Sequence, residues 1–104
     1  QGQVVELARM TGWRCMHVRR SIGKGNRWTT STSVVGWPDL VLWKPGRIIA
    51  AELKSATGQV TTEQALVLAS LEEAGMETHV WRPADLDEIA GVLGRRPRTE
   101  RQAG

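Results

Sequence analysis

Apolar side chains recur along the chain with helical and strand spacing in turn, which predicts an alternation of short helices and strands. Residues 4–8 place apolar side chains at helical spacing, and Gly12 follows, so a first helix is expected to end there. Residues 13–18 then predict a first strand. Residues 21–33 are rich in Gly, Ser, Thr and Asn and lack an apolar period, which is typical of a mobile loop.

Two short apolar runs, residues 39–43 and 48–53, flank the segment Lys44-Pro45-Gly46-Arg47. Proline pre-sets the backbone for one turn position and glycine tolerates the next, so the segment predicts the turn of a β-hairpin. With proline and glycine as the two loop residues, Lys44 pairs with Arg47. Counting back one residue per strand then fixes the register of the whole hairpin.

The second half of the chain predicts a helix, a strand and a last helix. The segment Thr61-Thr-Glu-Gln64 has the spacing of a capping box and precedes an apolar helix that should stop at Gly75. Residues 76–82 then predict a strand. Asp85, with an acidic residue three positions later, is expected to cap a last helix that Gly94 ends.

The expected order of elements is α-β-β-β-α-β-α, and a helix between the third and fourth strands makes a mixed sheet the natural solution. The fold class is therefore α/β, in the form of an α+β mixed sheet. A chain of 104 residues, 40% of them hydrophobic, suits one core rather than two. We expect a single domain over residues 1–94 and a basic, disordered tail over residues 95–104.

The formal net charge of +3 is modest, but positive and negative residues are separated along the chain. Residues 7–38 contain no acidic residue and six basic ones, which is typical of a face that binds phosphates. Four of the six lie in or beside the glycine-containing loop and are candidate DNA contacts: Arg19, Arg20, Lys24 and Arg27. An ordinary solvated surface would explain these charges as well.

Other features of the sequence limit the classes of protein. No apolar run is long enough for a membrane span and no signal peptide is indicated, so an intracellular, cytoplasmic protein is expected. The single Cys15 cannot form an internal disulfide and has no partner at zinc-ligand spacing. His79 lies inside a predicted strand and is expected to be structural.

Three residues of the predicted hairpin carry candidate chemistry. The register places Asp39 directly opposite Glu52, with Cβ atoms about 4.5–5.5 Å apart on one face, and like charges so placed repel. Lys54 lies two residues beyond Glu52 and so shares that face. Two carboxylates and a basic neighbour suit a hard ion such as Mg²⁺ and a phosphoryl-transfer reaction, in which the lysine positions water or stabilises developing charge.

These residues closely resemble a known nuclease signature. Gly36-Trp-Pro-Asp39, twelve intervening residues and Glu52-Leu-Lys54 resemble the motif of the PD-(D/E)XK nuclease superfamily, which has a restriction-endonuclease-like core. The downstream Thr61-x-x-Gln64 and a strand ending in Arg82 near Asp85 resemble its virus-type replication-repair nuclease (VRR-NUC) branch. The resemblance covers roughly residues 4–90.

The resemblance implies an activity and a set of partners. Members of that branch are DNA nucleases that depend on Mg²⁺ or Mn²⁺. Their short stand-alone versions are associated with phages and with homodimeric cleavage of branched DNA, such as Holliday junctions or flaps. For this chain the resemblance therefore implies a divalent-metal-dependent DNA endonuclease, with a homodimer in the host cytoplasm and no membrane partner.

The resemblance also implies roles for individual residues. Asp39 and Glu52 would be metal ligands, with the backbone carbonyl of Leu53 as an additional one. Lys54 would be the base-like or electrostatic catalytic residue. Glu6 matches an acidic residue of the family's first helix that reaches the metal or its waters, and Gln64 matches a polar helix position beside the site.

Other interpretations compete with this one. Asp39, Glu52 and Lys54 could form a surface salt-bridge cluster, although Glu52 follows an apolar strand that is expected to be buried. The capping box alone would explain Gln64, and the favourable placement of an acid at a helix start would explain Glu6. The rival function is a non-catalytic DNA-binding module of the same fold, and a second enzymatic alternative is cleavage of RNA.

Overall fold

The computed structural model describes residues 2–18 and 34–94. Its order of elements confirms the predicted one, with a short 3₁₀ turn added: α1 (Gly2–Met10), β1 (Arg14–His17), β2 (Leu40–Lys44), β3 (Arg47–Leu53), α2 (Thr62–Glu73), β4 (Glu77–Trp81), η2 (Pro83–Asp85) and α3 (Leu86–Gly94). The predicted loop, the basic tail and the four candidate DNA contacts lie outside the described residues: Arg19, Arg20, Lys24 and Arg27.

The four strands form one mixed sheet in the order β1-β2-β3-β4. Strand β2 is antiparallel to both of its neighbours, β1 and β3, whereas β3 and β4 are parallel, an arrangement that the helix between them makes possible. The β2–β3 hairpin pairs Lys44 with Arg47 and continues to Leu40 opposite Ala51, which is the predicted register. Gly46 has a φ of 87°, so the turn needs a residue that tolerates the left-handed region.

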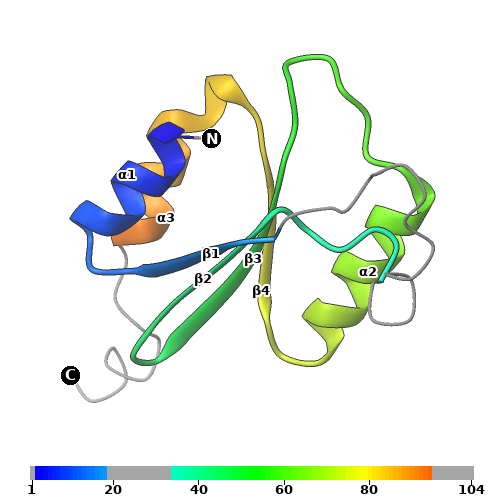
Figure 1. Ribbon diagram of the computed structural model, residues 1–104, viewed down its shortest axis with the longest axis horizontal. Coiled ribbons are helices and arrows are strands. Elements are labelled where there is room, and N and C mark those ends of the chain that lie inside the picture. The colour runs from blue at the N-terminus through cyan, green and yellow to red at the C-terminus, as the bar shows by residue number, and fades with distance from the viewer. Residues whose placement is uncertain (1, 19–33, 95–104) are drawn as a thin grey trace, which may run out of the picture.

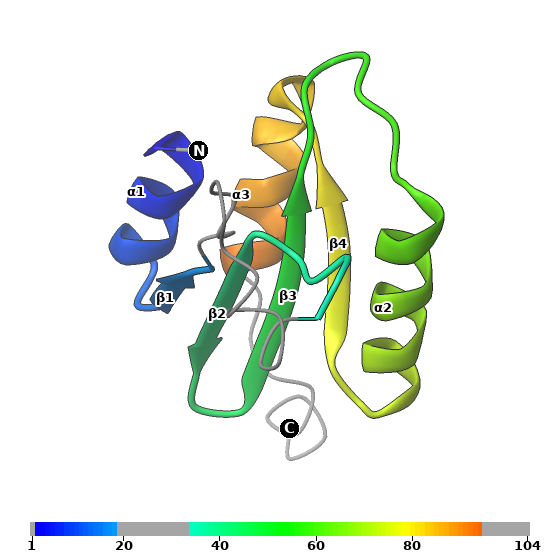
Figure 2. The same cartoon turned by 45° about the vertical axis from the view of Figure 1, so that its right-hand side comes forward.

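Helices cover the two faces of the sheet unequally. Helices α1 and α3 lie together on one side of it and α2 lies on the other (Figures 1 and 2). The main core lies on the α1/α3 side and contains the inward residues of both hairpin strands together with three residues of α3: Leu40, Leu42, Ile49, Ala51, Ile89, Val92 and Leu93. Because side chains alternate along a strand, Val41, Ala50 and Glu52 face the α2 side.

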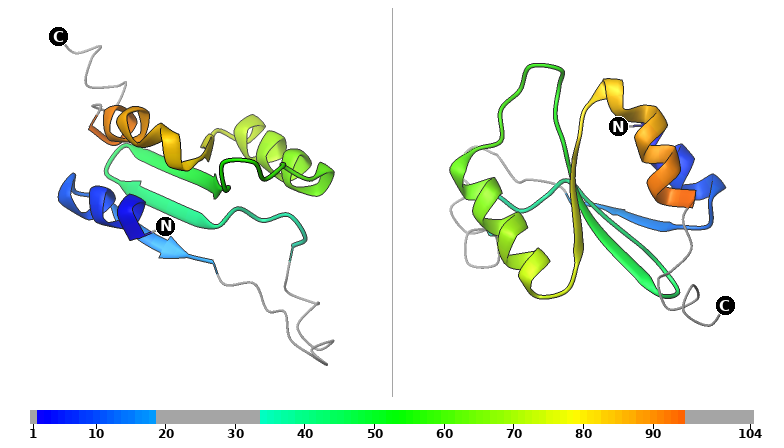
Figure 3. Two further views of the ribbon diagram at one scale, coloured as in Figure 1. Left: turned by 90° about the horizontal axis from the view of Figure 1, so that it is seen from above. Right: turned by 180° about the vertical axis from the view of Figure 1, so that it is seen from behind.

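Helix α2 is attached to the sheet by few side chains. Only Gln64 and Leu68 of its residues are buried, and Leu66 is 65% exposed. The views from above and from behind show α2 standing apart from α1 and α3, beside β4 (Figure 3). The packing of this helix therefore depends on its first turns.

The hairpin end of the sheet is held by a polar network. Arg47 donates to both carboxylate oxygens of Glu77 and to the carbonyl of Val92 at the end of α3, and it lies over the ring of Trp13. His79 contacts Glu77 at 3.0 Å. Burial raises the pKa of the Glu77 carboxyl, but the hydrogen bonds from Arg47 and His79 and their charges outweigh it, so that this pKa lies below its usual value. This placement agrees with a structural role for His79.

The start of the last helix differs from the prediction. Asp85 does not cap α3; its carboxylate accepts a hydrogen bond from the backbone N–H of Arg82 at 2.8 Å and closes the 3₁₀ turn that precedes the helix. Pro83 begins this turn because its fixed φ suits a first helical position. Among residues 2–18 and 34–94, no helix has the length and apolar character that a membrane span requires.

Candidate active site

Three segments distant in sequence meet at the end of the sheet opposite the hairpin turn. They are the residues just before β2, the last residues of β3 and the first turn of α2. The first brings Asp39, the second Glu52 and Lys54, and the third Gln64. All of them lie on the α2 side of the sheet, where Glu52 is one of two buried polar residues in the described part of the chain.

Asp39 and Glu52 occupy facing positions. Continuing the register by one residue from Leu40 and Ala51 pairs Asp39 with Glu52. The backbone carbonyl of Asp39 accepts from the N–H of Val18, the residue after β1, so its backbone faces away from β3 and the pair is of the non-hydrogen-bonded kind. In such pairs the Cα atoms approach to about 4.5 Å and the side chains are closest. The structure thus brings the two predicted carboxylates together.

The carboxylate of Asp39 reaches the backbone of β3. Its Oδ2 accepts a hydrogen bond from the N–H of Leu53 at 2.9 Å. In a strand the N–H and C=O of one residue point to the same neighbour, so the carbonyl of Leu53 is directed toward the same side. Pro38, which would face Leu53 in a continued register, has no N–H to donate to that carbonyl.

The hydrogen-bonded ladder between β3 and β4 also ends at a proline. The N–H of Lys54 donates to the carbonyl of Trp81 in β4 at 2.9 Å. In a parallel ladder the carbonyl of Lys54 would then accept from residue 83, which is a proline and has no N–H. Prolines on both sides therefore end the pairing of β3 at Leu53 and leave the carbonyls of its end without ladder donors.

Among the described residues, the side chains of Gln64 and Lys54 both contact the buried carboxylate of Glu52. Its side chain is 2% exposed, and its Oε2 accepts from the amide Nε2 of Gln64 at 3.0 Å. Lys54 is 15% exposed, and its Nζ lies 3.5 Å from the same oxygen. A buried carboxylate needs such partners because desolvation of an unpaired charge is expensive.

Gln64 links the site to the start of α2. The side-chain amide oxygen of Gln64 accepts from the backbone N–H of Thr61 at 2.9 Å. The backbone N–H of Gln64 donates to the hydroxyl of Thr61 at 3.1 Å. The predicted capping box is thus confirmed. With the oxygen used by the cap, the amide nitrogen faces Glu52, so one side chain caps the helix and positions the carboxylate.

The loop before Asp39 rests on the same helix. Gly36 has a φ of 91°, and a Cβ built there would lie 2.6 Å from the backbone carbonyl of Glu63 and 2.9 Å from the N of Gln64. Only glycine fits both the conformation and the space. This close approach fixes the distance between the segment that carries Asp39 and the helix that carries Gln64.

Glu6 is the predicted site residue that the structure leaves apart. It is exposed on α1, whose principal contacts are with α3 and β1. Within the described ranges, no three acidic, histidine or cysteine side chains gather closely enough to hold a metal ion. A centre with three carboxylates, in which Glu6 joins Asp39 and Glu52, is therefore not formed in this structure.

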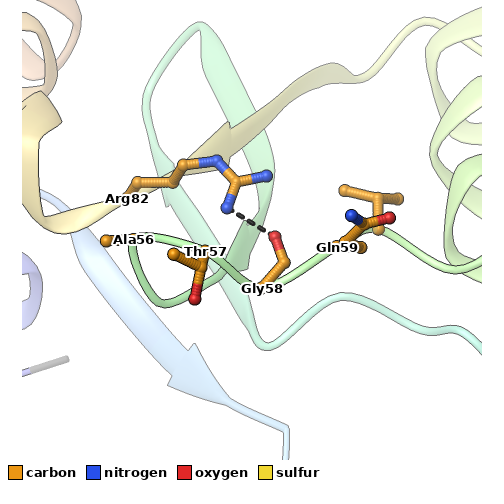
Figure 4. A pocket seen from close by; sticks show the side chains of 6 residues that line it. Ala56, Thr57, Gly58, Gln59 and Arg82 are labelled. Atoms are coloured by element: carbon orange, nitrogen blue, oxygen red, sulfur yellow. Dashed lines mark hydrogen bonds between the residues drawn. The ribbon is translucent and has the colours of Figure 1, made fainter.

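Arg82 is a residue near the site to which the sequence assigned no role. The pairing of Leu53 with Trp81 in β3 and β4 continues to Lys54 beside Arg82, and the extended backbone of Arg82 keeps its side chain on the face of Glu52. Its guanidinium lies over the loop that follows Lys54, where it borders a pocket (Figure 4). The continued parallel register is the signal that could have found it.

Comparisons with known proteins support the fold. No protein-family model matches the chain, and no curated protein sequence matches it. One similar solved structure is that of Hjc from Archaeoglobus fulgidus, a Holliday junction resolvase from an archaeal hyperthermophile, with a TM-score of 0.53 and 15% sequence identity over 79% of this chain. The chain spans 64% of the length of that resolvase. The likeness confirms the predicted restriction-endonuclease-like fold.

Proposed function

We propose that this protein is a divalent-metal-dependent DNA endonuclease of the PD-(D/E)XK superfamily and of its VRR-NUC branch. The observation that carries the proposal is the meeting of Asp39 and Glu52 across neighbouring strands, with Lys54 Nζ 3.5 Å from Glu52. A sheet gains nothing from two facing carboxylates, because like charges so placed are destabilising. Their cost is offset when they bind a cation.

The oxygen atoms at this end of the sheet suit Mg²⁺ or Mn²⁺. The carboxylates of Asp39 and Glu52 are hard donors, and the Leu53 carbonyl is directed to the Asp39 side with no donor from Pro38. These three groups would hold the ion, with water and substrate phosphate completing its ligands. When bound, the ion would polarise a phosphoryl oxygen and lower the pKa of a bound water. Glu6 would act only through a water.

The remaining side chains hold the reacting groups in place. Lys54 brings a positive charge beside the carboxylates, where it can orient a water molecule or stabilise the charge that develops on the phosphate. Gln64 keeps the Glu52 carboxylate in one orientation through its hydrogen bond. The low exposure of both Glu52 and Lys54 strengthens these electrostatic interactions, because less water screens them.

Branched DNA, such as a Holliday junction or a flap, is the proposed substrate. The fold likeness to a Holliday junction resolvase supports this choice, together with the VRR-NUC-like motifs. The basic stretch that carries Arg19, Arg20, Lys24 and Arg27 would contact phosphates. The cytoplasmic location and the phage association that the motifs imply belong to the same proposal.

The proposed assembly is a homodimer, which would present two sites to a branched duplex. Apolar side chains on the α2 side of the sheet support it. Met16, Trp43 and Ile48 are 48%, 38% and 44% exposed on adjacent strands, on the face that carries Glu52. A second copy would remove them from water. Sedimentation equilibrium of wild type and of Ile48→Glu tests this, since a dimer through this face should dissociate in the variant.

The proposal is tested by cleavage of a synthetic four-way junction, a flap and a single-stranded RNA with Mg²⁺ or Mn²⁺. Wild type should cut branched DNA, and Asp39→Asn should abolish cutting while it retains or improves DNA binding, because one negative charge near phosphate is removed. The amide oxygen of asparagine can still accept from Leu53, so the fold should persist. Asp87→Asn, exposed on α3, makes the same change away from the site and should cut normally.

Three outcomes would contradict the proposal. If wild type binds branched DNA but cuts none of the substrates, the protein is a DNA-binding module that keeps the fold. If it cuts RNA and leaves DNA intact, the substrate class is wrong. If Asp39→Asn cuts as fast as wild type, the carboxylate pair is not the site.

A further inference from the structure

Arg82 lies one residue beyond β4 and beside Lys54. Leu53 pairs with Trp81, and the backbone of Arg82 remains extended at φ −122° and ψ 167°. Side chains that alternate along the strand therefore place Arg82 on the face of Glu52 and Lys54. A second fixed positive charge thus borders the proposed site on the β4 side.

The guanidinium of Arg82 uses only part of its donor capacity within the protein. Its Nη1 donates to the backbone carbonyls of Ser55 at 2.9 Å and Gly58 at 2.6 Å. Across the described ranges, Nε and Nη2 donate to no protein atom and no carboxylate forms an ion pair with this side chain. Asp85, the nearest acid in sequence, binds the backbone N–H of Arg82 instead. The two carbonyls hold the planar group in one orientation and leave its charge unneutralised.

A pocket lies against this side chain. It has a volume of about 400 Å³, and its wall consists of Arg82 and of residues 56–60, the loop after Lys54 and Ser55. No acidic residue of segments 2–18 and 34–94 lines it. Figure 4 shows the guanidinium above the loop, with Gln59 at the same opening. An Arg with free donors, in a pocket without acids, suits an anion with a planar pair of acceptor oxygens, and a phosphate has such a pair.

We propose that the Arg82 pocket binds a backbone phosphate of the DNA strand, next to the phosphate that is hydrolysed at Asp39, Glu52 and Lys54. The inference rests on the proposed function, because the loop that lines the pocket follows Lys54 and Ser55 directly, so that a strand bound at the site would lie beside it. Arg82 is then a positioning residue: it fixes the strand one or two nucleotides from the reacting bond. A purely structural clamp would need the Nη1 contacts alone.

The test measures DNA binding without cleavage, in an Asp39→Asn background. The variant Arg82→Met keeps the aliphatic stem and removes the charge. It should weaken binding to a four-way junction about tenfold and lower the slope of log K against log salt by about one, as expected for one lost phosphate contact. The matched control is Lys44→Met, at the hairpin end over Trp13, which should leave binding unchanged.

Single methylphosphonates, scanned through the strand around the cut site, identify the phosphate. At one position the uncharged methylphosphonate should weaken DNA binding about tenfold when Arg82 is present. The same substitution should not weaken binding further in the Arg82→Met variant. Arg82→Lys, which keeps the charge but not the planar pair of donors, serves if Arg82→Met does not fold. It should keep the salt slope and show a smaller effect at that position than Arg82 does.

The outcomes separate this inference from the function on which it rests. If the protein cuts and binds DNA but Arg82→Met changes only the melting temperature, Arg82 is a clamp of the loop and the pocket proposal fails alone. It fails in the same way if millimolar inorganic phosphate binds to the pocket while no methylphosphonate position depends on Arg82. If wild type neither binds nor cuts DNA, the proposed function fails and this inference with it.

Discussion

Replacement of Gln64 by glutamate tests the geometry of the site without any assay of activity. The carboxylate of the new side chain can still accept from the N–H of Thr61, so the capping box survives the change. The group that faces Glu52, however, is no longer a donor. Gln64→Glu therefore places a third carboxylate 3.0 Å from the buried Oε2 of Glu52, where an amide nitrogen now lies.

Two magnitudes decide the size of the effect. At that separation, with an effective dielectric constant of 20, two unit charges repel by about 5 kcal/mol. Uptake of a proton by one carboxyl avoids the repulsion. For a glutamate with an ordinary pKa of about 4.3, this protonation costs about 3.7 kcal/mol at neutral pH. Protonation is the cheaper route, so we expect a loss of about 3–4 kcal/mol in the free energy of unfolding.

The pH dependence identifies the cause. The added carboxyl is protonated in the folded variant and ionised when it unfolds at neutral pH. The pKa of the added carboxyl is therefore higher in the folded variant than in the unfolded chain. The loss of stability is absent below the unfolded pKa of about 4.3 and grows as pH rises above it. Urea unfolding at several pH values measures this. Ala65→Glu is the matched control, since it adds the same charge at an exposed neighbour and should show little loss.

A divalent cation provides a second readout. If Glu52 binds the ion, millimolar Mg²⁺ should recover part of the stability that Gln64→Glu loses, because the ion neutralises the crowded carboxylates. It should not stabilise Ala65→Glu more than wild type. A variant as stable as wild type from acid to neutral pH, or a loss that does not vary with pH, would show that Gln64 does not face Glu52.

Three further predictions concern separate parts of the structure. Lys54→Met keeps the half-buried stem but should lower the single-turnover cleavage rate by orders of magnitude, and an unchanged rate would remove the lysine from the mechanism. Glu77→Gln should reduce the free energy of unfolding most at neutral pH. Because the pKa of Glu77 is lowered in the fold, the stabilisation that its carboxylate provides is lost as pH falls below about 4.3. A difference in unfolding free energy between variant and wild type that persists in acid would contradict the pairing with Arg47. Gly36→Ala should cost at least about 2 kcal/mol in thermal or urea unfolding, whereas Gly91→Ala, in open space on α3, should be neutral or stabilising.

The sequence predicted most of the fold because its signals are local. A Pro-Gly pair fixes the hairpin turn and with it the register, which brings Asp39 opposite Glu52. The spacing of Thr61 and Gln64 predicts the start of α2, and helical and strand periods give the order of elements. Each of these depends on a few neighbouring residues.

What the sequence did not predict depends on contacts between distant segments. Nothing near Gln64 indicates that its amide nitrogen reaches Glu52, and nothing near Gly36 indicates that it rests on the carbonyl of Glu63. The sequence placed Arg82 at the end of a strand without giving it a role, and the parallel pairing of β3 and β4 is what brings it beside Lys54. The prediction that Asp85 caps the last helix was wrong because its carboxylate binds a backbone N–H before the helix instead.

The sparse attachment of α2 has a consequence for how the molecule opens. The helix is held by two buried side chains, and one of them, Gln64, is also the partner of Glu52. Any local opening that lifts the first turn of α2 therefore removes a hydrogen-bond donor from this carboxylate, so fraying of the helix at this end disturbs the proposed site. Conversely, a ligand that fixes Glu52 would also hold the helix in place, and binding at the site would lower the mobility of α2.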